Sequence, residues 1–568
     1  MNDIRRTILW VIFGFSSVML WDQWQLHNGK QATFFPGAVQ TAGKVANSGA
    51  PSAKPNDVPS SGMTASGQPA PSDAAQLPTG QATQAREEVV AQTDVLKVTF
   101  DTQGGTILRT EFLKIADKDD KSRNLMLLDD SKTHTYLAQS GLIAAAGGLG
   151  LPTHKTVMTL VSTERSLKDG DNTLLVRFES PEVGGIKLAK TYTLSRGSYA
   201  MAVKHEVSNV GATAAKPQLY LQLVRDGSKP AGESSFYSTF TGPAVYTEAQ
   251  KYQKVSFEDI DKNKVDIEKT ATNGYVAMVQ HYFASAWLLG DGITRELFTR
   301  KVDTNLYAVG MIAPLNELAP GASQSIDARF FVGPQIEKTL EALAPGMELV
   351  KDYGWLTVLA KPLYWLLDKL HGFLQNWGWS IVALVVLLKA AFYWLNAKAY
   401  ASMAKMKAVN PRITEMRDRL KDNPQQMQQE MMRIYREEKV NPMGGCLPIM
   451  IQIPVFIALY WVLLSSVEMR HAPWMGWIQD LSAPDPYFIL PLVMAVTTVI
   501  QTSLNPAPPD PMQAKLMWFM PLAFSVMFFF FPSGLVMYWI TNNILSIAQQ
   551  WVINTRMGVP PKFHLPKF

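Results

Sequence analysis

At 568 residues the chain is too long for one hydrophobic core, so we expect several domains. Its 53 Lys and Arg residues nearly balance its 48 Asp and Glu residues, and the net charge of +5 is modest for this length. No basic stripe with interleaved aromatic residues runs along the sequence, so DNA binding is not expected. Cys446 is the only cysteine, which excludes a disulfide within the chain.

The first 90 residues predict a membrane anchor followed by a tether. Two arginines precede an apolar stretch from Ile8 to Trp21, which ends without the small residues of a cleavage site. Residues 1–26 therefore predict an uncleaved signal anchor, and a signal peptide that is removed is the alternative. Residues 27–90 are rich in Ala, Gly, Pro, Ser, Thr and Gln, and bury too little apolar surface to fold. We expect a disordered tether there.

Residues 91–340 predict an all-β domain. Apolar and polar residues alternate with a period of two from Val95 to Phe100, and again after Gly104-Gly105, as in a hairpin. Gly, Asn, Asp and Pro separate further runs of this kind. These runs are Thr173–Phe178, Ile186–Leu194, Tyr199–Val207, Gln218–Leu223, Tyr275–Leu289, Leu306–Ile312 and Ser325–Val332. Many short strands at such spacing are typical of a β-sandwich.

The rest of the chain predicts a membrane-embedded helical domain. Leucines gather near one face within residues 341–376, so we expect an amphipathic helix in the outer bilayer interface, with a plain linker helix as the alternative. Five apolar runs follow, and together with the N-terminal anchor they predict six transmembrane helices. The runs are residues 377–396, 447–466, 487–503, 516–531 and 534–553.

Charges in the loops between these runs predict the orientation. The loop 397–446 holds ten Lys and Arg residues against six acidic residues, whereas 467–486 holds Arg470 against three acidic residues. Positive loops stay in the cytoplasm. We therefore expect loop 397–446, loop 504–515, tail 554–568 and the N-terminus in the cytoplasm, and the β-domain on the opposite side.

Two of the predicted spans are short. Runs 487–503 and 516–531 fall below the roughly 20 residues that cross a bilayer in a helix. A short span thins the bilayer locally, which lowers the barrier to other segments that cross there. The alternative is that these boundaries are wrong by one helical turn.

Lys389 is the candidate functional residue because it lies inside the apolar run 377–396. A charge at this depth costs roughly 2.5–3.5 kcal/mol on insertion scales and marks a functional site by default. Other polar residues, among them Gln452 and Asn542, lie toward the cytoplasmic half of their spans. We expect a water-filled groove that is open to the cytoplasm and holds Lys389.

Loop 397–446 predicts a helical hairpin, because Asn423-Pro424 separates two helical segments. Methionine suits surfaces that accept varied apolar partners, so the hairpin is a candidate site for capture of substrate segments. Packing of the two helices against each other is the alternative for about half of these residues. The candidate residues are Met403, Met406, Met427, Met431 and Met432. Basic residues of the hairpin form a solvated face or contact lipid headgroups or ribosomal RNA.

Motifs of nucleotide and metal chemistry are absent from the sequence. It contains no G-x-x-x-x-G-K-[ST], no H-E-x-x-H and no C-x-x-C. We therefore expect no cofactor, no metal ion, no nucleotide hydrolysis and no enzymatic activity.

Five strings in one order resemble the YidC-type membrane protein insertases of Gram-negative inner membranes. The strings are Gln429-Glu430-Met431-Met432, Val440–Pro448, Gln452-Ile453-Pro454, Ala483–Tyr487 and Phe531–Trp539. The resemblance covers the whole chain. It implies a periplasmic β-super-sandwich similar to sugar mutarotases and a five-helix core after the first anchor. It also implies insertion of nascent membrane proteins into the lipid bilayer, alone or beside the Sec translocon, with the ribosome contacted through the hairpin and tail.

The resemblance also assigns the groove. The groove charge of the family is usually Arg, and the matching position here is Lys389. Lys keeps the positive charge and loses the bidentate guanidinium. Gln452 and Trp539 match other groove positions, with Tyr538 adjacent. Trp539 would offer an aromatic wall to a sliding apolar segment, and ordinary packing is the alternative.

Two other functions compete with insertion. A solute transporter or channel would need a closed pathway and usually paired charges, whereas Lys389 looks unpaired. An anchored carbohydrate-binding or epimerising domain would place all activity in residues 91–340, and it does not explain six spans.

Overall fold

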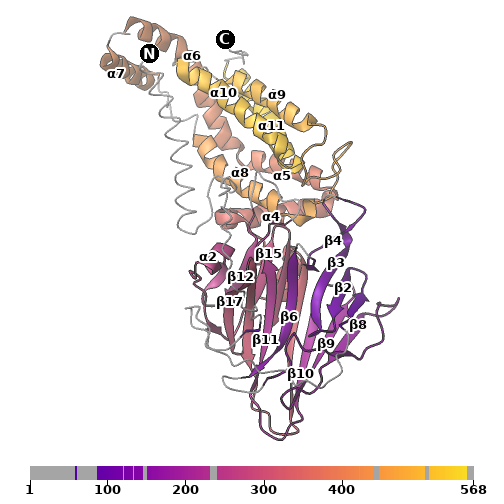
Figure 1. The fold of residues 1–568 in the computed structure, drawn as a ribbon. Coiled ribbons are helices and arrows are strands. Elements are labelled where there is room, and N and C mark those ends of the chain that lie inside the picture. The colour runs from indigo at the N-terminus through magenta and orange to yellow at the C-terminus, as the bar shows by residue number, and fades with distance from the viewer. Residues whose placement is uncertain are drawn as a thin grey trace, which may run out of the picture. The chain divides into compact units, whose positions relative to one another are not determined.

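The computed structural model describes two compact units that divide between Lys351 and Asp352 (Figure 1). The described residues are 58–59, 86–118, 120–131, 134–144, 150–230, 239–420, 423–438, 447–505 and 511–558. The predicted signal anchor, residues 1–26, lies outside them. We call the unit before Asp352 the β-unit and the unit that starts there the helical unit.

The β-unit is a sandwich of two antiparallel sheets, as the alternating sequence predicts. The first sheet has ten described strands in the order β1-β2-β3-β6-β11-β18-β17-β14, with β4 paired to β3 and β5 to β6. Its strands are β1 (Glu88–Gln92), β2 (Leu96–Asp101), β3 (Thr106–Ala116), β4 (Asn124–Met126), β5 (Asp129–Asp130), β6 (Thr135–Ala144), β11 (Pro217–Asp226), β14 (Thr270–Ala271), β17 (Arg295–Asp303) and β18 (Leu306–Pro314).

The second sheet has nine described strands in the order β13-β12-β15-β16-β19-β10-β9-β8-β7. They are β7 (Thr159–Leu160), β8 (Thr173–Glu179), β9 (Ile186–Ser195), β10 (Ala200–Asn209), β12 (Gly242–Thr247), β13 (Lys251–Lys254), β15 (Tyr275–Gln280), β16 (Phe283–Leu289) and β19 (Ser323–Pro334). Two short helices, α2 (Phe257–Asp261) and α3 (Glu337–Leu343), and the 3-10 turn η1 (Met347–Val350) complete the unit.

Two sequence boundaries in the β-unit differ from the structure. The run Tyr275–Leu289 is two strands, because the chain turns at His281-Tyr282. The sequence did not indicate this turn, because no Gly or Pro lies there. The predicted tether ends early, since β1 starts at Glu88. Val58, inside the predicted tether, packs against side chains of the first sheet.

A fully buried lysine lies between the two sheets. Lys190 of β9 donates from Nζ to the carbonyl oxygens of Gly104 and Ser140, at 2.6 and 2.7 Å. The Ser140 hydroxyl in turn bonds His205 Nε2 at 3.0 Å. Burial lowers the pKa of Lys190 to about 7 and the pKa of His205 to about 3. The folded domain therefore favours the neutral forms of the Lys190 and His205 side chains.

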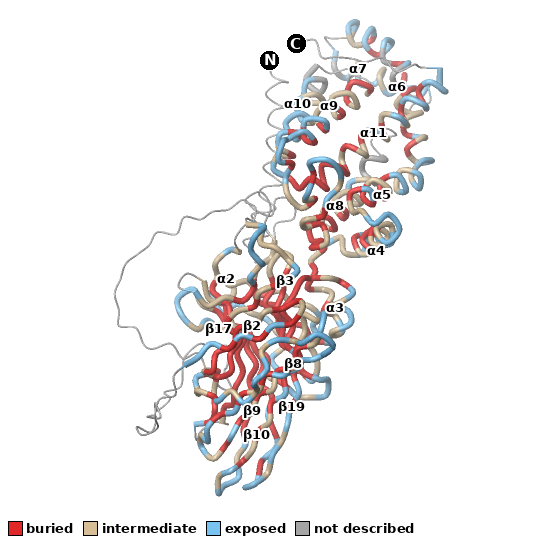
Figure 2. The backbone as a smooth tube through the Cα atoms, turned by 90° about the vertical axis from the view of Figure 1, so that its right-hand side faces the viewer, coloured by how far each residue is buried: buried red, intermediate tan, exposed pale blue. Residues whose placement is uncertain are grey.

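The helical unit contains eight described α-helices (Figure 2). They are α4 (Thr357–Leu374), α5 (Trp377–Ala391), α6 (Tyr393–Arg419), α7 (Pro424–Glu437), α8 (Leu447–Ser465), α9 (Ile489–Leu504), α10 (Pro511–Met527) and α11 (Ser533–Arg556). Short 3-10 turns are η2 (Gly354–Leu356), η3 (Val467–Met469) and η4 (Phe528–Phe530). Helix α11 packs against α5, α6, α8 and α9, and α4 packs against α5 and α8.

The helices follow the predicted spans except at one bend. The predicted span 377–396 is not one straight helix, since α5 ends at Ala391 and the chain bends by 67° into α6. The bend falls just after Lys389, where the uninterrupted apolar sequence ends.

The described helices vary in length and apolar character. None of them is by itself long and apolar enough to cross a membrane, whereas the bent pair Trp377–Ala391 and Tyr393–Met406 meets that test together. Shorter apolar helices are Gln452–Ser465, Ile489–Leu504 and Lys515–Phe530. The number of spans therefore stays a prediction.

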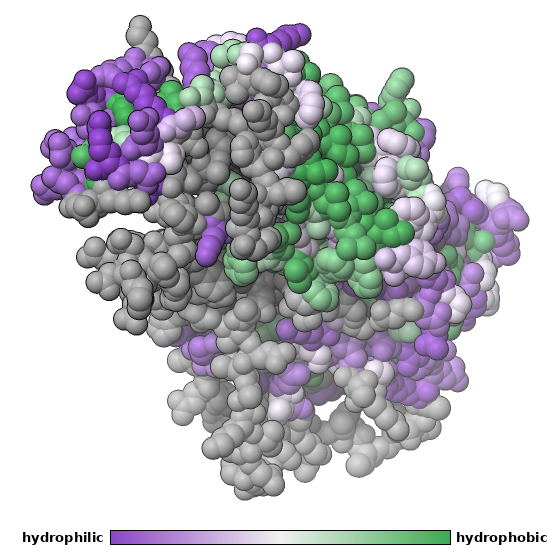
Figure 3. Space-filling model, turned by 90° about the horizontal axis from the view of Figure 1, so that it is seen from above, coloured by the Kyte–Doolittle hydropathy of each residue, from purple (hydrophilic) through white to green (hydrophobic). Residues whose placement is uncertain are grey.

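Apolar side chains remain exposed on the helical unit. The face of α4 that carries Leu363 and Leu367 packs into the helical core, whereas Val358 and Phe373 are 85% and 86% exposed. Large apolar residues of α9 and α10, such as Val496 and Phe519, are also exposed. Seen from above, this unit shows a broad apolar area beside the hydrophilic surface of α6 and α7 (Figure 3). Apolar patches of this size are typical of surfaces that contact a membrane or a partner.

Lys190 predicts how the stability of the β-unit depends on pH. The folded domain releases the Lys190 proton near pH 7 and the unfolded chain near 10.5, so the unfolded state binds more protons between these values. The free energy of unfolding should therefore rise with pH in this window, by up to about 1.4 kcal/mol per unit. The measurement is the urea midpoint for proteolysis of the β-unit in the full-length chain, from pH 7 to 10.

Lys190→Met should flatten this pH slope, whatever its effect on absolute stability. Lys187→Met is the matched control, because Lys187 lies on the same strand with its side chain exposed. An unchanged slope in Lys190→Met would show that other groups cause it.

Candidate functional site

Lys389 lies in the last turn of α5 and contacts a neutral partner. Its Nζ donates to the Ser546 hydroxyl of α11 at 2.8 Å, and that hydroxyl donates to the Asn542 carbonyl at 2.7 Å. The Tyr400 hydroxyl of α6 also bonds Ser546. Lys389 is half-buried, and no carboxylate of a described residue forms an ion pair with it. No described carboxylate therefore neutralises Lys389, and its side chain is still partly accessible.

Helix α11 carries a stripe of residues that connects three other helices. Trp539, Asn542, Ser546 and Gln549 are spaced by three and four residues, so they lie on one side of the helix. Ser546 meets Lys389 of α5, and Gln549 Nε2 donates to the Tyr393 carbonyl of α6 at 3.3 Å. The stripe is aromatic toward the start of α11 and polar toward its end. We call these four residues the groove stripe.

A second, neighbouring stripe fixes α11 to α9. Asn543 Nδ2 donates to the hydroxyls of Thr497 and Thr498 at 3.3 and 3.0 Å. Two turns further, Gln550 Nε2 donates to the Leu504 carbonyl at 3.4 Å and to Asn505 Oδ1 at 3.2 Å. Both amides are buried. Such interhelical bonds hold membrane helices in register, so these residues position the groove stripe.

The predicted groove residue Gln452 of α8 meets a partner that the sequence did not indicate. Its Nε2 donates to Asn396 Oδ1 of α6 at 3.0 Å. Asn396 is 2% exposed, and its Nδ2 has no hydrogen-bond acceptor among the described residues. A buried amide with an unused donor can bond a carbonyl oxygen that comes close to it.

The two predicted aromatic residues differ in exposure. Tyr538 is buried and stacks on Phe456 at 5.7 Å between ring centroids. Trp539 is half-buried and contacts Phe456 edge-on at 4.8 Å and Phe528 at 5.2 Å. Tyr538 therefore belongs to the helical core, whereas part of Trp539 remains available to another chain.

The hairpin methionines divide into two groups. Met406, Met427 and Met431 pack against the small core that joins α6 to α7, as the packing alternative predicts. Met403 is partly buried, as these three are, whereas Met432 is 49% exposed. Met432 therefore presents the most surface to a partner.

Two arginines of the hairpin form ion pairs. Arg412 bonds Glu437 and Glu438, and Arg433 bonds Glu430 and Glu437. These pairs are exposed, so they contribute little to stability. The Arg412 pairs join α6 to the end of α7, whereas the Arg433 pairs lie within α7.

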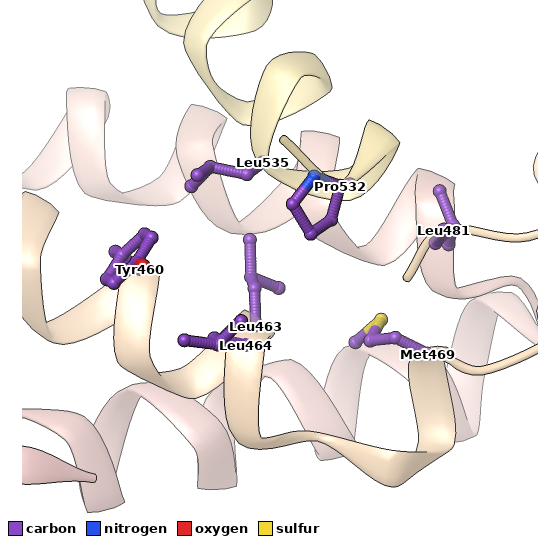
Figure 4. A pocket seen from close by; sticks show the side chains of 8 residues that line it. Tyr460, Leu463, Leu464, Met469, Leu481, Pro532 and Leu535 are labelled. Atoms are coloured by element: carbon purple, nitrogen blue, oxygen red, sulfur yellow. The ribbon is translucent and has the colours of Figure 1, made fainter. Parts of the chain in front are cut away.

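A narrow pocket at the start of α11 is distinct from this site. Figure 4 shows it between α8, the loop that follows α8, and the first turn of α11. It is lined by Tyr460, Leu463, Leu464, Met469, Leu481, Pro532, Gly534 and Leu535. Because nearly all of these side chains are apolar, the pocket does not suit a charged segment.

The sequence predicts Lys389, Gln452, Trp539 and Asn542 as groove residues and does not indicate the partners that they contact. Ser546 lies one turn after Asn542 and two turns after Trp539, and this spacing was the available signal. Asn396 and Tyr400 gave no signal, because their roles depend on how α6 bends away from α5.

Comparisons with known proteins agree over both units. The family model described as YidC periplasmic domain matches residues 88–366, and the one described as 60Kd inner membrane protein matches residues 369–559. The protein named membrane protein insertase YidC in Cupriavidus necator is 56% identical over 561 residues, which cover 98% of each chain. The protein of that name in Ralstonia nicotianae is 54% identical and covers 99% of each chain.

Solved structures give weaker likenesses. The crystal structure of an active YidC insertase with its first transmembrane domain resolved has a TM-score of 0.36 at 17% identity. The match covers 82% of this chain and 92% of that one. The family therefore rests on the sequence matches, which span nearly the whole chain. By these matches the chain belongs to the YidC family of membrane protein insertases of the inner membrane, with a periplasmic β-sandwich domain.

Proposed function

We propose that nascent membrane proteins enter the bilayer along the groove stripe of α11, with Lys389 as the receiving charge. One observation carries this proposal: the Lys389 ammonium is half-buried and bonds a hydroxyl instead of a carboxylate. A carboxylate paired with the ammonium would cancel most of its electric field. This ammonium is available to a polar or acidic flank of a substrate.

The attraction between the ammonium and an acidic group is stronger in this site than in bulk water. At an effective dielectric constant of about 20, two unit charges 4 Å apart interact by about 4 kcal/mol, against about 1 kcal/mol in bulk water. An acidic flank that enters the site is therefore drawn toward Lys389. A Lys in place of the usual Arg keeps this attraction, because the attraction requires charge rather than a bidentate fork.

The apolar part of the substrate supplies the driving force. Each CH₂ group that moves from water into lipid contributes roughly 0.8 kcal/mol. We infer that the substrate leaves the stripe past the exposed part of Trp539, while the exposed apolar residues of α9 and α10 face lipid. No nucleotide-binding motif occurs in the sequence, and we infer that insertion requires no nucleotide hydrolysis by this chain.

Topology and partners follow from the loop charges and the family. We infer six spans, with both termini and the hairpin in the cytoplasm and α4 in the outer interface. Met403 and Met432 of the hairpin would hold an emerging apolar segment. The Sec translocon and the ribosome are the partners that the family resemblance favours, the latter through the hairpin and tail.

Substitution of Lys389 tests the electrostatic step. Lys389→Arg should retain insertion of all substrates in proteoliposomes, whereas Lys389→Glu should lower insertion of acidic-flanked substrates about tenfold or more. Tenfold corresponds to about 1.4 kcal/mol, less than the attraction estimated above. Lys405→Glu makes the same charge change on an exposed part of α6 and should have little effect. Equal insertion by Lys389→Glu and the unchanged chain would remove Lys389 from the mechanism.

Photo-crosslinking tests the path along α11. A photoreactive residue at Trp539 or Gln452 should crosslink to stalled nascent chains, because both positions contribute to the groove. The same probe at Ile544 is the matched control, since this residue lies on α11 away from both stripes and is 50% exposed. Crosslinks from Ile544 as strong as those from Trp539 would contradict a path confined to the groove stripe.

A further inference from the structure

The β-unit buries part of the face of its first sheet that points away from the second sheet. Tyr136 and Ser140 of β6 point inward, since they bond Ser285 and His205 of the other sheet. The alternate residues of these strands therefore point outward. Among them are Gln139, Tyr220, Gln222 and Ile312, and all four are at most 8% exposed. A covering layer must exclude water from this outward face.

Two glycines and two aromatic rings shape the outward face. A Cβ on Gly141 would lie 2.5 Å from the Tyr220 hydroxyl, and a Cβ on Gly310 would lie 2.5 Å from the ring of Phe298. Each ring thus rests over a position without a side chain. The backbone N–H of His154 donates to the Tyr220 hydroxyl at 2.9 Å and fixes that ring. The result is a largely apolar bed across β6, β11, β18 and β17.

Val58 and Pro59 occupy this bed. Val58 packs against the buried cluster of Ile143, Tyr220 and Ile312, as Phe298 does, and Pro59 is buried. Arg300 Nη1 donates to the Val58 carbonyl at 3.5 Å, and Arg300 Nη2 bonds Gln222 Oε1 at 3.3 Å. The bed therefore recognises apolar side chains together with one backbone carbonyl.

The dipeptide suits an extended binding mode. A residue before proline is confined to extended conformations, and proline loses little entropy on binding because its φ is fixed. Residues 60–87 join Pro59 to the start of β1, so the contact is intramolecular. Binding within one chain needs less intrinsic affinity than binding of a separate peptide, so even a weak contact is populated.

We propose that Val58-Pro59 is a latch that docks the tether onto the outward face of the first sheet. The latch leaves residues 27–57, instead of 27–87, between the predicted anchor and the β-unit. The latch thus shortens the connection to the β-unit without a change in sequence length.

Crosslinking in the full-length chain tests whether the latch is closed. Cys446→Ser removes the native thiol, Val58→Cys and Phe298→Cys supply a pair, and a specific protease site inserted after Ala70 separates the two positions. A short bis-maleimide should keep the cleaved fragments joined on a denaturing gel. The control pair is Val45→Cys with Phe298→Cys, which uses another valine of the same tether. We expect at least tenfold faster crosslinking from position 58, and equal rates would overturn the latch.

A peptide tests whether the bed binds this sequence in its own right. A peptide of residues 52–65, with a photoreactive residue in place of Met63, should label the β-unit of full-length Val58→Asp. It should label the unchanged chain several-fold less, because the tether already fills the bed. A peptide that itself carries Val58→Asp is the matched control. Labelling of both chains to the same extent, or no labelling of Val58→Asp, would overturn the proposal.

Discussion

The helical unit depends on one unusual hydrogen bond, between the ammonium of Lys389 and the hydroxyl of Ser546. A lysine among apolar helices is tolerated only if its donors are satisfied or water reaches it. A carboxylate partner would satisfy it most strongly and would also cancel its charge. A hydroxyl satisfies one donor and leaves the charge intact. The bond therefore gives the ammonium a stable position without a counter-charge beside it.

The position of Ser546 depends in turn on the two stripes of α11. The Asn543 and Gln550 amides fix this helix to α9, while the neighbouring groove stripe meets α5, α6 and α8. One helix thus determines where the charge, the half-exposed Trp539 and the polar groups lie relative to each other. Apolar packing alone tolerates sliding of one helix along another, because lipid and leucine are equally apolar. Buried amides restrict that sliding, which explains why polar residues lie between α9 and α11.

Much of the fold could be predicted because its signals are local. The alternation in β9 and β10, for example, is visible in the sequence and appears as alternating burial. The missed features are not local. The turn at His281-Tyr282 lacks a marker residue, and the bend after Ala391 occurs without Pro or Gly. For the site, Lys389 stood out by its apolar neighbours, whereas Ser546 is 157 residues away and becomes its partner only through packing of α5 on α11.

Lys190 and Lys389 show why a buried lysine is not by itself a functional site. Both ammonium groups bond neutral oxygens, and neither forms an ion pair with a described carboxylate. Lys190 is fully buried between two sheets, so no other molecule reaches it and burial favours its neutral form. Lys389 is half-buried beside a stripe of polar side chains. Solvent access to the side chain therefore distinguishes the two lysines. Lys190 is enclosed in the core of the β-unit, whereas the Lys389 side chain remains partly accessible.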